Sequence, residues 1–268
     1  MYKSLVSKNV AALMLNPDIE SEKADEVLHG MVVEVEKEEK NGWYLVKTHY
    51  GYYGYIHRDD VLQDSKIAED WKHNEYVIWK MIADVMAEPK YASYTLQTLV
   101  RGCRVKYTGE FSDKWEKIGL ADGSFGWIRK GFARIIKKYS AEEREESVRE
   151  SIVGTALEYL GCQYRWGGKS PLGIDCSGLS SMAYMLNGII IPRDAGLQEK
   201  YLKPIEREAA KPGDLFFFPG HVALCIGNGR YVHSTSKEGY VVINSFNHGS
   251  EEYREDLEKE LRNTGTIF

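Results

Sequence analysis

The chain has 268 residues, a formal net charge of −5, 43% hydrophobic and 28% charged residues. This length predicts two or three small domains with real hydrophobic cores. The acidic balance gives no basic surface of the kind that binds nucleic acid or an anionic membrane, so we expect neither partner. The four cysteines show no C-x-x-C spacing, which favours a reducing compartment without a structural disulfide.

The N-terminal segment contains a short apolar run, residues 10–15. This run is below the roughly 7–15 residues of a signal-peptide core. No run in the sequence is long enough to span a membrane. We therefore expect a first strand here and a cytoplasmic protein. The alternative is a degenerate secretion signal on an exported, wall-associated protein.

Residues 1–65 predict a small β-barrel, because aromatic and β-branched runs alternate with glycine as in short strands joined by tight turns. These runs lie at 31–35, 42–47 and 52–56. The same plan returns in residues 70–137, where 99–105, 114–118 and 123–128 match 27–33, 42–46 and 51–56. Two copies with a period near seventy residues are too few for a solenoid and predict two similar barrels.

A charged segment, residues 137–146, marks the predicted junction to a third domain, residues 140–268. Ser140 and Glu143 form a capping box. Apolar residues then recur at helical spacing up to Gly161. This pattern predicts a helix whose acidic run faces solvent and whose apolar stripe packs beside a second helix after Cys176.

Cys176 stands at the start of that second predicted helix. Its apolar stripe consists of Leu179, Met182, Ala183 and Leu186. Asp175 is the expected N-cap, and Gly188 the expected stop. Unsatisfied N–H groups and the helix dipole favour an anion there, so we expect a lowered pKa and a partly ionised thiol. The alternative is a small, buried, inert cysteine.

Two histidines lie in a predicted hairpin around Asn228-Gly229. A strict two-residue loop would pair Leu224 with His233 and place His221 on the opposite face from His233. A three-residue loop, residues 227–229, pairs Ala223 with His233. The two histidines are then diagonal neighbours on one face, about 7–8 Å apart. We predict the second register, because a thiol, a base and a base-orienting group make a nucleophilic triad.

Four motifs carry a resemblance to a known family. They are Tyr-Arg-Trp-Gly-Gly (164–168), Asp-Cys-Ser-Gly-Leu (175–179), Gly-His-Val-Ala (220–223) and Val-His-Ser (232–234). With these in order, residues 145–246 resemble the NlpC-type cell-wall cysteine peptidases. The resemblance implies an α+β fold, with a papain-like peptidase core preceded by two small SH3-like β-barrels of the bacterial kind. It also implies hydrolysis of peptide bonds in peptidoglycan stems.

The resemblance implies a role for each catalytic residue. Cys176 is the expected nucleophile, His221 the base and His233 the orienting residue. A zinc site made of these three side chains was the alternative. It lacks a close ligand pair such as H-E-x-x-H, so we expect neither a metal nor another cofactor.

The resemblance also implies substrate contacts. Tyr164 would lie beside the thiol and help form the oxyanion and substrate environment, while Asp175 and Ser177 would bind the N-terminal L-Ala of the stem. In family members with two barrels, an acidic residue and a tyrosine of the first barrel meet the free amino end of the peptide. Glu22 is the candidate carboxylate for that ammonium and Tyr55 its partner. The competing side chains are Glu20, Asp25, Glu26 and Tyr52.

The implied activity is an endopeptidase that cuts the γ-D-glutamyl–diamino acid bond of L-Ala-γ-D-Glu-diamino acid peptides during murein recycling. The main alternative is an exported hydrolase of intact cell wall, with the barrels as wall-binding modules. A non-enzymatic binding protein and an acyltransferase are further alternatives. An amine can resolve a thioester as water does, so the sequence leaves the acyltransferase open.

The remaining expectations concern packing. Cys162 and Cys225 should be buried, although Cys225 shares the strand face of His221 and is a rival nucleophile. Arg193-Asp194 predicts a local salt link, with a substrate contact as the alternative. The run 215–218 predicts a buried strand. Residues 240–246 predict the last strand, followed by a polar tail.

Overall fold

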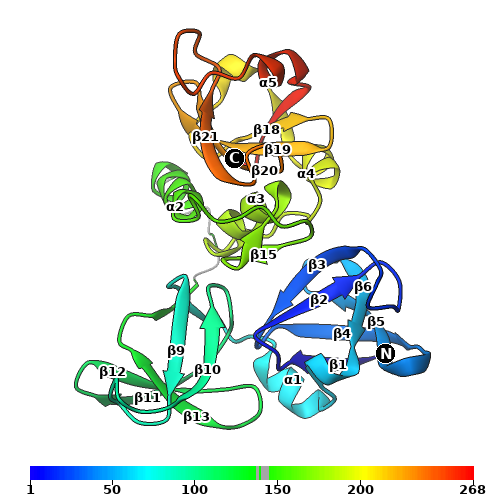
Figure 1. The fold of residues 1–268 in the computed structure, drawn as a ribbon, viewed down its shortest axis with the longest axis vertical. Coiled ribbons are helices and arrows are strands. Elements are labelled where there is room, and N and C mark those ends of the chain that lie inside the picture. Colours follow the sequence, from blue (N-terminus) through cyan, green and yellow to red (C-terminus); the bar gives the residue numbers. More distant parts are fainter. Residues whose placement is uncertain (137–138, 140–144) are drawn as a thin grey trace. The chain divides into compact units, whose positions relative to one another are not determined.

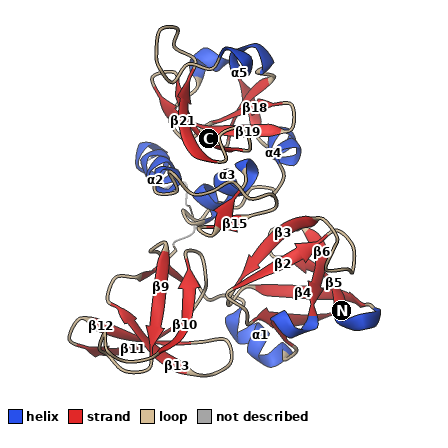
Figure 2. Ribbon diagram, viewed as in Figure 1, coloured by secondary structure: helices blue, strands red, loops and turns tan. Residues whose placement is uncertain are grey.

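The computed structural model describes residues 1–136, 139 and 145–268. The chain folds into two compact units, residues 1–136 and residues 137–268 (Figure 1). The first unit is rich in strands, and the second combines strands with helices (Figure 2). Within the described ranges, no helix has the length and apolar character needed to cross a membrane. The predicted capping box of Ser140 and Glu143 lies outside the described residues.

The first lobe of the first unit, residues 1–62, is built on one seven-stranded antiparallel sheet in the order β3-β2-β6-β5-β4-β1-β7. Its strands are β1 Tyr2–Val6, β2 Val10–Met14, β3 Lys23–Leu28, β4 Val32–Glu38, β5 Trp43–Thr48, β6 Tyr53–His57 and β7 Val61–Leu62. Short 3-10 turns occupy Lys40–Gly42 and Arg58–Asp60. The strands predicted at 31–35, 42–47 and 52–56 are confirmed, and the N-terminal segment forms two strands instead of one.

The second lobe, residues 76–135, follows the short helix α1, Ser65–Trp71, which the Asp64 side chain caps. Its strands are β8 Tyr76–Ile78, β9 Ile82–Met86, β10 Thr95–Val100, β11 Lys106–Ser112, β12 Trp115–Gly119, β13 Phe125–Arg129 and β14 Ala133–Ile135. Five of them form a sheet in the order β10-β9-β13-β12-β11, and β14 pairs with β8.

The internal repeat is visible in the strands of the two lobes. β3 and β10 begin 72 residues apart, at Lys23 and Thr95. Glycines with positive φ recur at the same spacing, Gly30 with Gly102 and Gly51 with Gly123. Each pair sits in a tight turn that an L side chain would strain. The repeated sequence therefore folds into repeated turns, as the matching segments of residues 1–65 and 70–137 predicted.

The two lobes interlock through backbone contacts. The buried His29 ring bonds the carbonyl of Arg104 through Nδ1 at 3.0 Å and accepts the N–H of Ala121 at Nε2, 3.1 Å away. Asn9 Oδ1 accepts the N–H of Val100 at 3.1 Å. A Cβ on Gly30 would lie 2.4 Å from the carbonyl oxygen of Arg104. These contacts leave no room for a side chain at Gly30.

This packing predicts a position-specific cost for alanine. Gly30→Ala adds a backbone clash to the strain of positive φ, so it should lower the free energy of unfolding by about 3 kcal/mol or more. Gly51→Ala is the matched control, because it has a similar φ of 78° and nothing within 4 Å of the added Cβ. It should cost about 1 kcal/mol. Urea unfolding followed by tryptophan fluorescence measures both, and equal costs would contradict the interlock.

The second unit has a six-stranded antiparallel sheet in the order β17-β22-β18-β19-β20-β21. Its strands are β17 Lys203–Ile205, β18 Leu215–Phe218, β19 His221–Gly227, β20 Arg230–Thr235, β21 Tyr240–Ser245 and β22 Asn263–Thr266, with a small pair of β15 Lys169–Ser170 and β16 Gly173–Ile174. Its helices are α2 Glu145–Leu157, α3 Cys176–Met185, α4 Ala195–Tyr201 and α5 Glu255–Glu260, and a 3-10 turn spans Arg207–Ala209. As predicted, α2 packs beside α3, and both lie against β19.

The strand predicted at residues 240–246 is confirmed as β21, Tyr240–Ser245, but the prediction that it is the last strand is wrong. The chain continues through α5 and returns as β22, which pairs with β17 on one side and β18 on the other. Its sequence, Asn-Thr-Gly-Thr, has no apolar alternation to announce a strand. Gly265 allows the close approach, because a Cβ there would lie 2.9 Å from that of Leu202.

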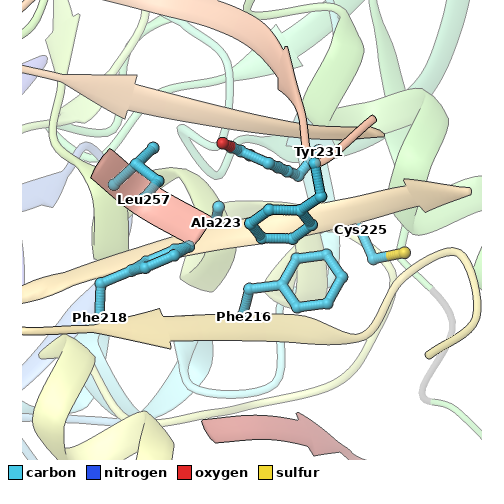
Figure 3. Close-up of a cluster of buried hydrophobic side chains, with 7 residues drawn as sticks. Phe216, Phe218, Ala223, Cys225, Tyr231 and Leu257 are labelled. Carbon is cyan, nitrogen blue, oxygen red and sulfur yellow. The ribbon is translucent and has the colours of Figure 1, made fainter. Parts of the chain in front are cut away.

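A buried aromatic cluster anchors the sheet between β18, β20 and α5 (Figure 3). Its members are Phe216, Phe218, Ala223, Cys225, Tyr231, Phe246 and Leu257.

Cys225 is buried in this cluster as predicted, and burial raises its pKa to about 11. Cys162 is only half-buried, contrary to expectation, with its sulfur 3.2 Å from the carbonyl oxygen of Pro171. All four cysteines are free thiols.

Candidate active site

Helix α3 begins at Cys176, and Asp175 caps it as predicted. The Asp175 carboxylate accepts the backbone N–H of Gly178 at 2.6 Å. Gly178 lies directly against the loop that precedes the helix, since a Cβ there would be 2.2 Å from the carbonyl oxygen of Gly168. This contact explains the glycines of the two motifs. They let the loop after Tyr164 and the first turn of α3 approach backbone to backbone.

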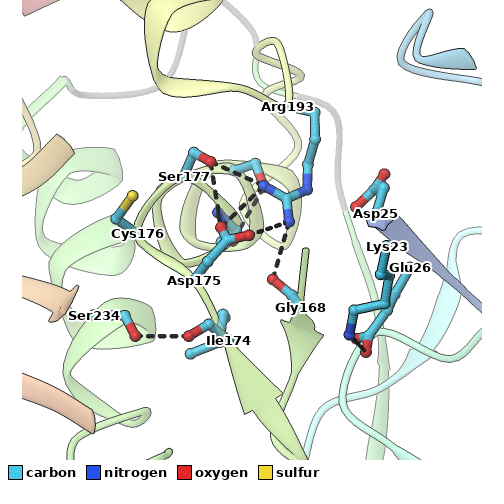
Figure 4. Close-up of polar contacts among 12 residues, drawn as sticks. Lys23, Asp25, Glu26, Gly168, Ile174, Asp175, Cys176, Ser177, Arg193 and Ser234 are labelled. Atoms are coloured by element: carbon cyan, nitrogen blue, oxygen red, sulfur yellow. Dashed lines mark hydrogen bonds and ion pairs between the residues drawn. The ribbon is translucent and has the colours of Figure 1, made fainter. Parts of the chain in front are cut away.

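A buried ion pair holds the segment before Cys176 in place (Figure 4). The Arg193 guanidinium donates to Asp175 through both terminal nitrogens, at 2.7 Å to Oδ2 and 3.0 Å to Oδ1. It also donates to Ser177 Oγ at 2.9 Å and to the carbonyl of Gly168 at 3.1 Å. Arg193 therefore forms a salt link with Asp175, eighteen residues earlier in the chain.

Two further side chains tie α3 to its surroundings. Gln198 on α4 donates to the carbonyl of Ser177 at 3.1 Å, and its Oε1 accepts from Ser180 at 2.8 Å. Ser234 on β20 donates to the carbonyl of Ile174 at 2.6 Å (Figure 4). The start of α3 is thus fixed to the same strand that carries His233.

The β19–β20 hairpin adopts the predicted register by a different turn. Leu224 lies opposite Val232, which places Ala223 opposite His233. The loop itself has two residues, Asn228 and Gly229, and both have positive φ. A bulge between Cys225 and Gly227 adds the extra residue that the three-residue loop was expected to supply. The predicted loop length is therefore wrong, while the predicted face of the histidines is confirmed.

The two histidines are joined by a hydrogen bond. His221 Nε2 lies 2.7 Å from His233 Nδ1. Burial lowers the pKa of His221 to about 3, with contributions from His233 and Arg254. Burial likewise lowers the pKa of His233 to about 4. Both rings are therefore neutral near pH 7, which is the state that a proton acceptor requires.

The Cys176 sulfur lies beside the start of β19. Backbone N–H groups of Val222 and Ser177 stabilise its thiolate, but burial and the Asp175 charge dominate and raise the pKa to about 11. The expected ionised thiol is therefore wrong, because the desolvation of the sulfur outweighs the favourable field of the helix start. The resting group is a neutral thiol next to neutral histidines.

Asn244 on β21 is a site residue that the sequence analysis missed. Its Oδ1 lies 2.8 Å from His233 Nε2. The residues 221, 233 and 244 step diagonally across three neighbouring strands. A polar residue inside a buried strand was the available signal. It could not be used because the length of the turn between β20 and β21 was unknown.

The other predicted site residues are placed as follows. Tyr164 is half-buried, and burial together with the nearby Cys176 and Asp175 charges raises its pKa to about 12. Glu22 is exposed just before β3, and Tyr55 is half-buried on β6, both in the first unit. Of the competing carboxylates, Asp25 accepts from Tyr50, and Glu26 pairs with Lys23 (Figure 4). The predicted binding roles of Glu22 and Tyr55 remain predictions.

A metal site was the alternative for the cysteine and the histidines. Across residues 1–136, 139 and 145–268, no group of three or more His, Cys, Asp or Glu side chains is arranged to hold a metal ion. The facing ring nitrogens of His221 and His233 bond each other.

The ion pair at the start of α3 generates a stability prediction. Arg193→Gln leaves the Asp175 carboxylate buried with fewer donors, so it should destabilise the second unit by about 3–5 kcal/mol. Arg207→Gln is the control, since Arg207 pairs with Glu258 at 3.2 Å on the surface of the same unit. It should cost less than about 1 kcal/mol. Native-state hydrogen exchange of peptides from 145–268 measures both, and similar costs would contradict the role of the buried pair.

Comparisons with known proteins agree with this geometry. A model described as the NlpC/P60 family matches residues 161–256, and one described as a bacterial SH3 domain matches residues 15–61. A protein named dipeptidyl-peptidase 6 from Lysinibacillus sphaericus is 42% identical, and the match covers 99% of each chain. A protein named gamma-D-glutamyl-L-lysine dipeptidyl-peptidase from Bacillus cereus is 26% identical over 77% of this chain and 66% of its own length.

The fold is similar to that of a solved NlpC/P60 family protein from Bacillus cereus. The TM-score is 0.81 at 22% identity, over 98% of this chain and 99% of that chain. The full-length relationship at 42% identity and the family match around Cys176 confirm the resemblance seen in the motifs. The chain belongs to the NlpC/P60 family and is a cysteine peptidase.

Proposed function

We propose that the protein is an endopeptidase that hydrolyses the γ-D-glutamyl–diamino acid bond of stem peptides carrying a free N-terminal L-Ala. Its place would be the recycling of peptidoglycan fragments in the cytoplasm. One observation carries most of this proposal, the similarity over the whole chain to a protein named dipeptidyl-peptidase 6. The similarity to a protein named for γ-D-glutamyl-L-lysine supports the bond that we propose.

The proposed chemistry begins with a neutral Cys176 thiol and a neutral His221 imidazole. His221 takes the proton of the Cys176 thiol as the sulfur attacks the scissile carbonyl carbon, because the thiol is protonated at rest. The C–N bond then breaks, and the imidazolium returns the proton to the leaving amine. Water attacks the thioester with His221 again as base and releases the free γ-carboxylate. His233 keeps the base oriented through its hydrogen bond.

Backbone groups at the start of α3 would stabilise the oxyanion. This helix terminus has N–H groups without helical partners, and the Ser177 N–H already faces the sulfur. Tyr164 stands next to the same atoms and keeps its proton, since its pKa is raised to about 12. It can therefore donate a hydrogen bond to the developing charge at neutral pH.

The free amino end of the substrate needs acceptors. Asp175 Oδ2 accepts one bond from Arg193, and a carboxylate oxygen has capacity for a further donor. Ser177 and Asp175 thus remain our candidates for the L-Ala end, with Glu22 and Tyr55 from the first unit as the second part of the amine site. A carboxylate that pairs with the ammonium would discriminate against N-acylated peptides.

The test uses L-Ala-γ-D-Glu-meso-diaminopimelate and its N-acetylated form, followed by mass spectrometry. We expect cleavage of the free-amine peptide only, and complete loss of activity in Cys176→Ala. Glu22→Gln should lower kcat/KM by about tenfold or more through loss of a charge-assisted contact. Glu20→Gln is the matched control, because it removes a neighbouring exposed carboxylate.

The outcomes separate the alternatives. Equal cleavage of both peptides would remove Glu22 from the amine site and favour an exported hydrolase of intact wall. Cleavage of neither peptide would overturn the proposed substrate. Transfer of the acyl group to an added amine in preference to water would identify an acyltransferase.

A further inference from the structure

The two histidines belong to a longer chain of hydrogen bonds. His221 on β19 bonds His233 on β20, and His233 Nε2 bonds Asn244 Oδ1 on β21 at 2.8 Å. His233 and Asn244 are both buried. His233 and Asn244 therefore depend on their neighbours for their hydrogen bonds, because water has little access to them.

A backbone carbonyl fixes the orientation of Asn244 at the far end. Asn244 Nδ2 lies 3.1 Å from the carbonyl oxygen of Glu252. That oxygen can only accept, so the amide nitrogen of Asn244 must face it, and Oδ1 must face His233. The carbonyl is itself held in place, since it also accepts the N–H of Ser245 at 2.9 Å.

The donor and acceptor roles then follow along the chain. Asn244 Oδ1 accepts, so His233 must carry its proton on Nε2 and is an acceptor at Nδ1 when neutral. His221 must in turn donate from Nε2 to that nitrogen. The lone pair of neutral His221 is then on Nδ1. The carbonyl of Glu252, at one end of this chain, therefore determines which nitrogen of His221, at the other end, can accept the thiol proton.

We propose that Asn244 is a positioning residue of the peptidase site, which selects the tautomers of both histidines and thereby leaves Nδ1 of His221 free to take the Cys176 proton. This role rests on the proposed use of Cys176 and His221 in catalysis, and it needs no particular substrate. Without the amide oxygen, His233 could carry its proton on either nitrogen. In the tautomer with Nδ1–H, His233 would donate to Nε2 of His221. The proton of neutral His221 would then lie on Nδ1, which could no longer accept the thiol proton.

The charged groups around the histidines do not supply this selection. Arg254, the residue before α5, lowers the pKa of both rings by charge repulsion, and Asp256 opposes this effect at His233. Arg254 and Asp256 are bound to each other through both ends of the carboxylate, at 2.7 Å in each case. Burial is the main reason why both rings resist protonation, and Arg254 and Asp256 only adjust that resistance, whereas Asn244 sets which nitrogen carries the single proton.

The test reads the tautomers directly. Two-bond proton–nitrogen correlation spectra of the full, nitrogen-15-labelled chain near neutral pH distinguish protonated from unprotonated ring nitrogens. His221→Gln and His233→Gln spectra assign the signals. We expect protonated Nε2 and unprotonated Nδ1 in both rings of the wild type. A proton on Nδ1 of either ring would overturn the proposal, whatever peptide the enzyme cuts.

Variants connect the tautomers to reactivity. In Asn244→Leu we expect mixed tautomers of His233 and a drop of about tenfold or more in the rate of Cys176 alkylation by iodoacetamide, because part of the general-base contribution is lost. Asn244→Asp keeps an acceptor but adds a charge that raises the pKa of both histidines, so the acid limb of the alkylation profile should move to higher pH.

The control is Asn247→Leu, because Asn247 also donates to a backbone carbonyl, that of Asn228 at 2.7 Å, and is not a member of the hydrogen-bonded chain of His221, His233 and Asn244. It should alkylate at the wild-type rate. A folded Asn244→Leu protein with the wild-type rate and tautomers would refute the positioning role. If that variant does not fold, the wild-type spectrum and the pH profile of Asn244→Asp decide the question.

Discussion

The hydrogen bond between His221 and His233 is the interaction on which the active site depends, and it exists only in one register of the β19–β20 hairpin. A shift by one residue would turn one ring to the other face of the sheet. The bulge between Cys225 and Gly227 sets this register, and the aromatic cluster under the strands stabilises it. The chemistry of the site is therefore encoded in a backbone irregularity several residues away from either histidine.

The start of α3 supplies the nucleophile Cys176, and tight packing around this helix start holds the residue in place. Arg193 neutralises Asp175 inside the protein, and close backbone contacts at Gly168 and Gly178 hold the helix against the preceding loop. The resulting desolvation keeps the Cys176 thiol protonated. A neutral thiol is a weak nucleophile until a base removes its proton, so the reactivity of Cys176 is coupled to the histidines and not to the helix dipole alone.

Much of this arrangement was predictable from local sequence signals. The N-cap and the repeated turns of the first unit follow from short patterns. The shared face of His221 and His233 was predicted from the needs of a catalytic triad, through a loop length that proved wrong. The failures concern quantities that depend on tertiary packing. The pKa of Cys176 follows from burial, β22 follows from the space between β17 and β18, and Asn244 depends on the length of the turn before β21. None of these has a signature within a few residues.

The most direct measurement of the central claim is the trapping of an acyl-enzyme. The full chain is mixed with the free-amine stem peptide, quenched in acid within the first turnovers and digested for mass spectrometry. The account predicts an L-Ala-γ-D-Glu acyl group on Cys176 as a thioester, and a marked decrease of this adduct in His221→Gln. Peptide cleavage that persists in Cys176→Ala, or an acyl group found on Cys162 or Cys225 instead, would contradict it.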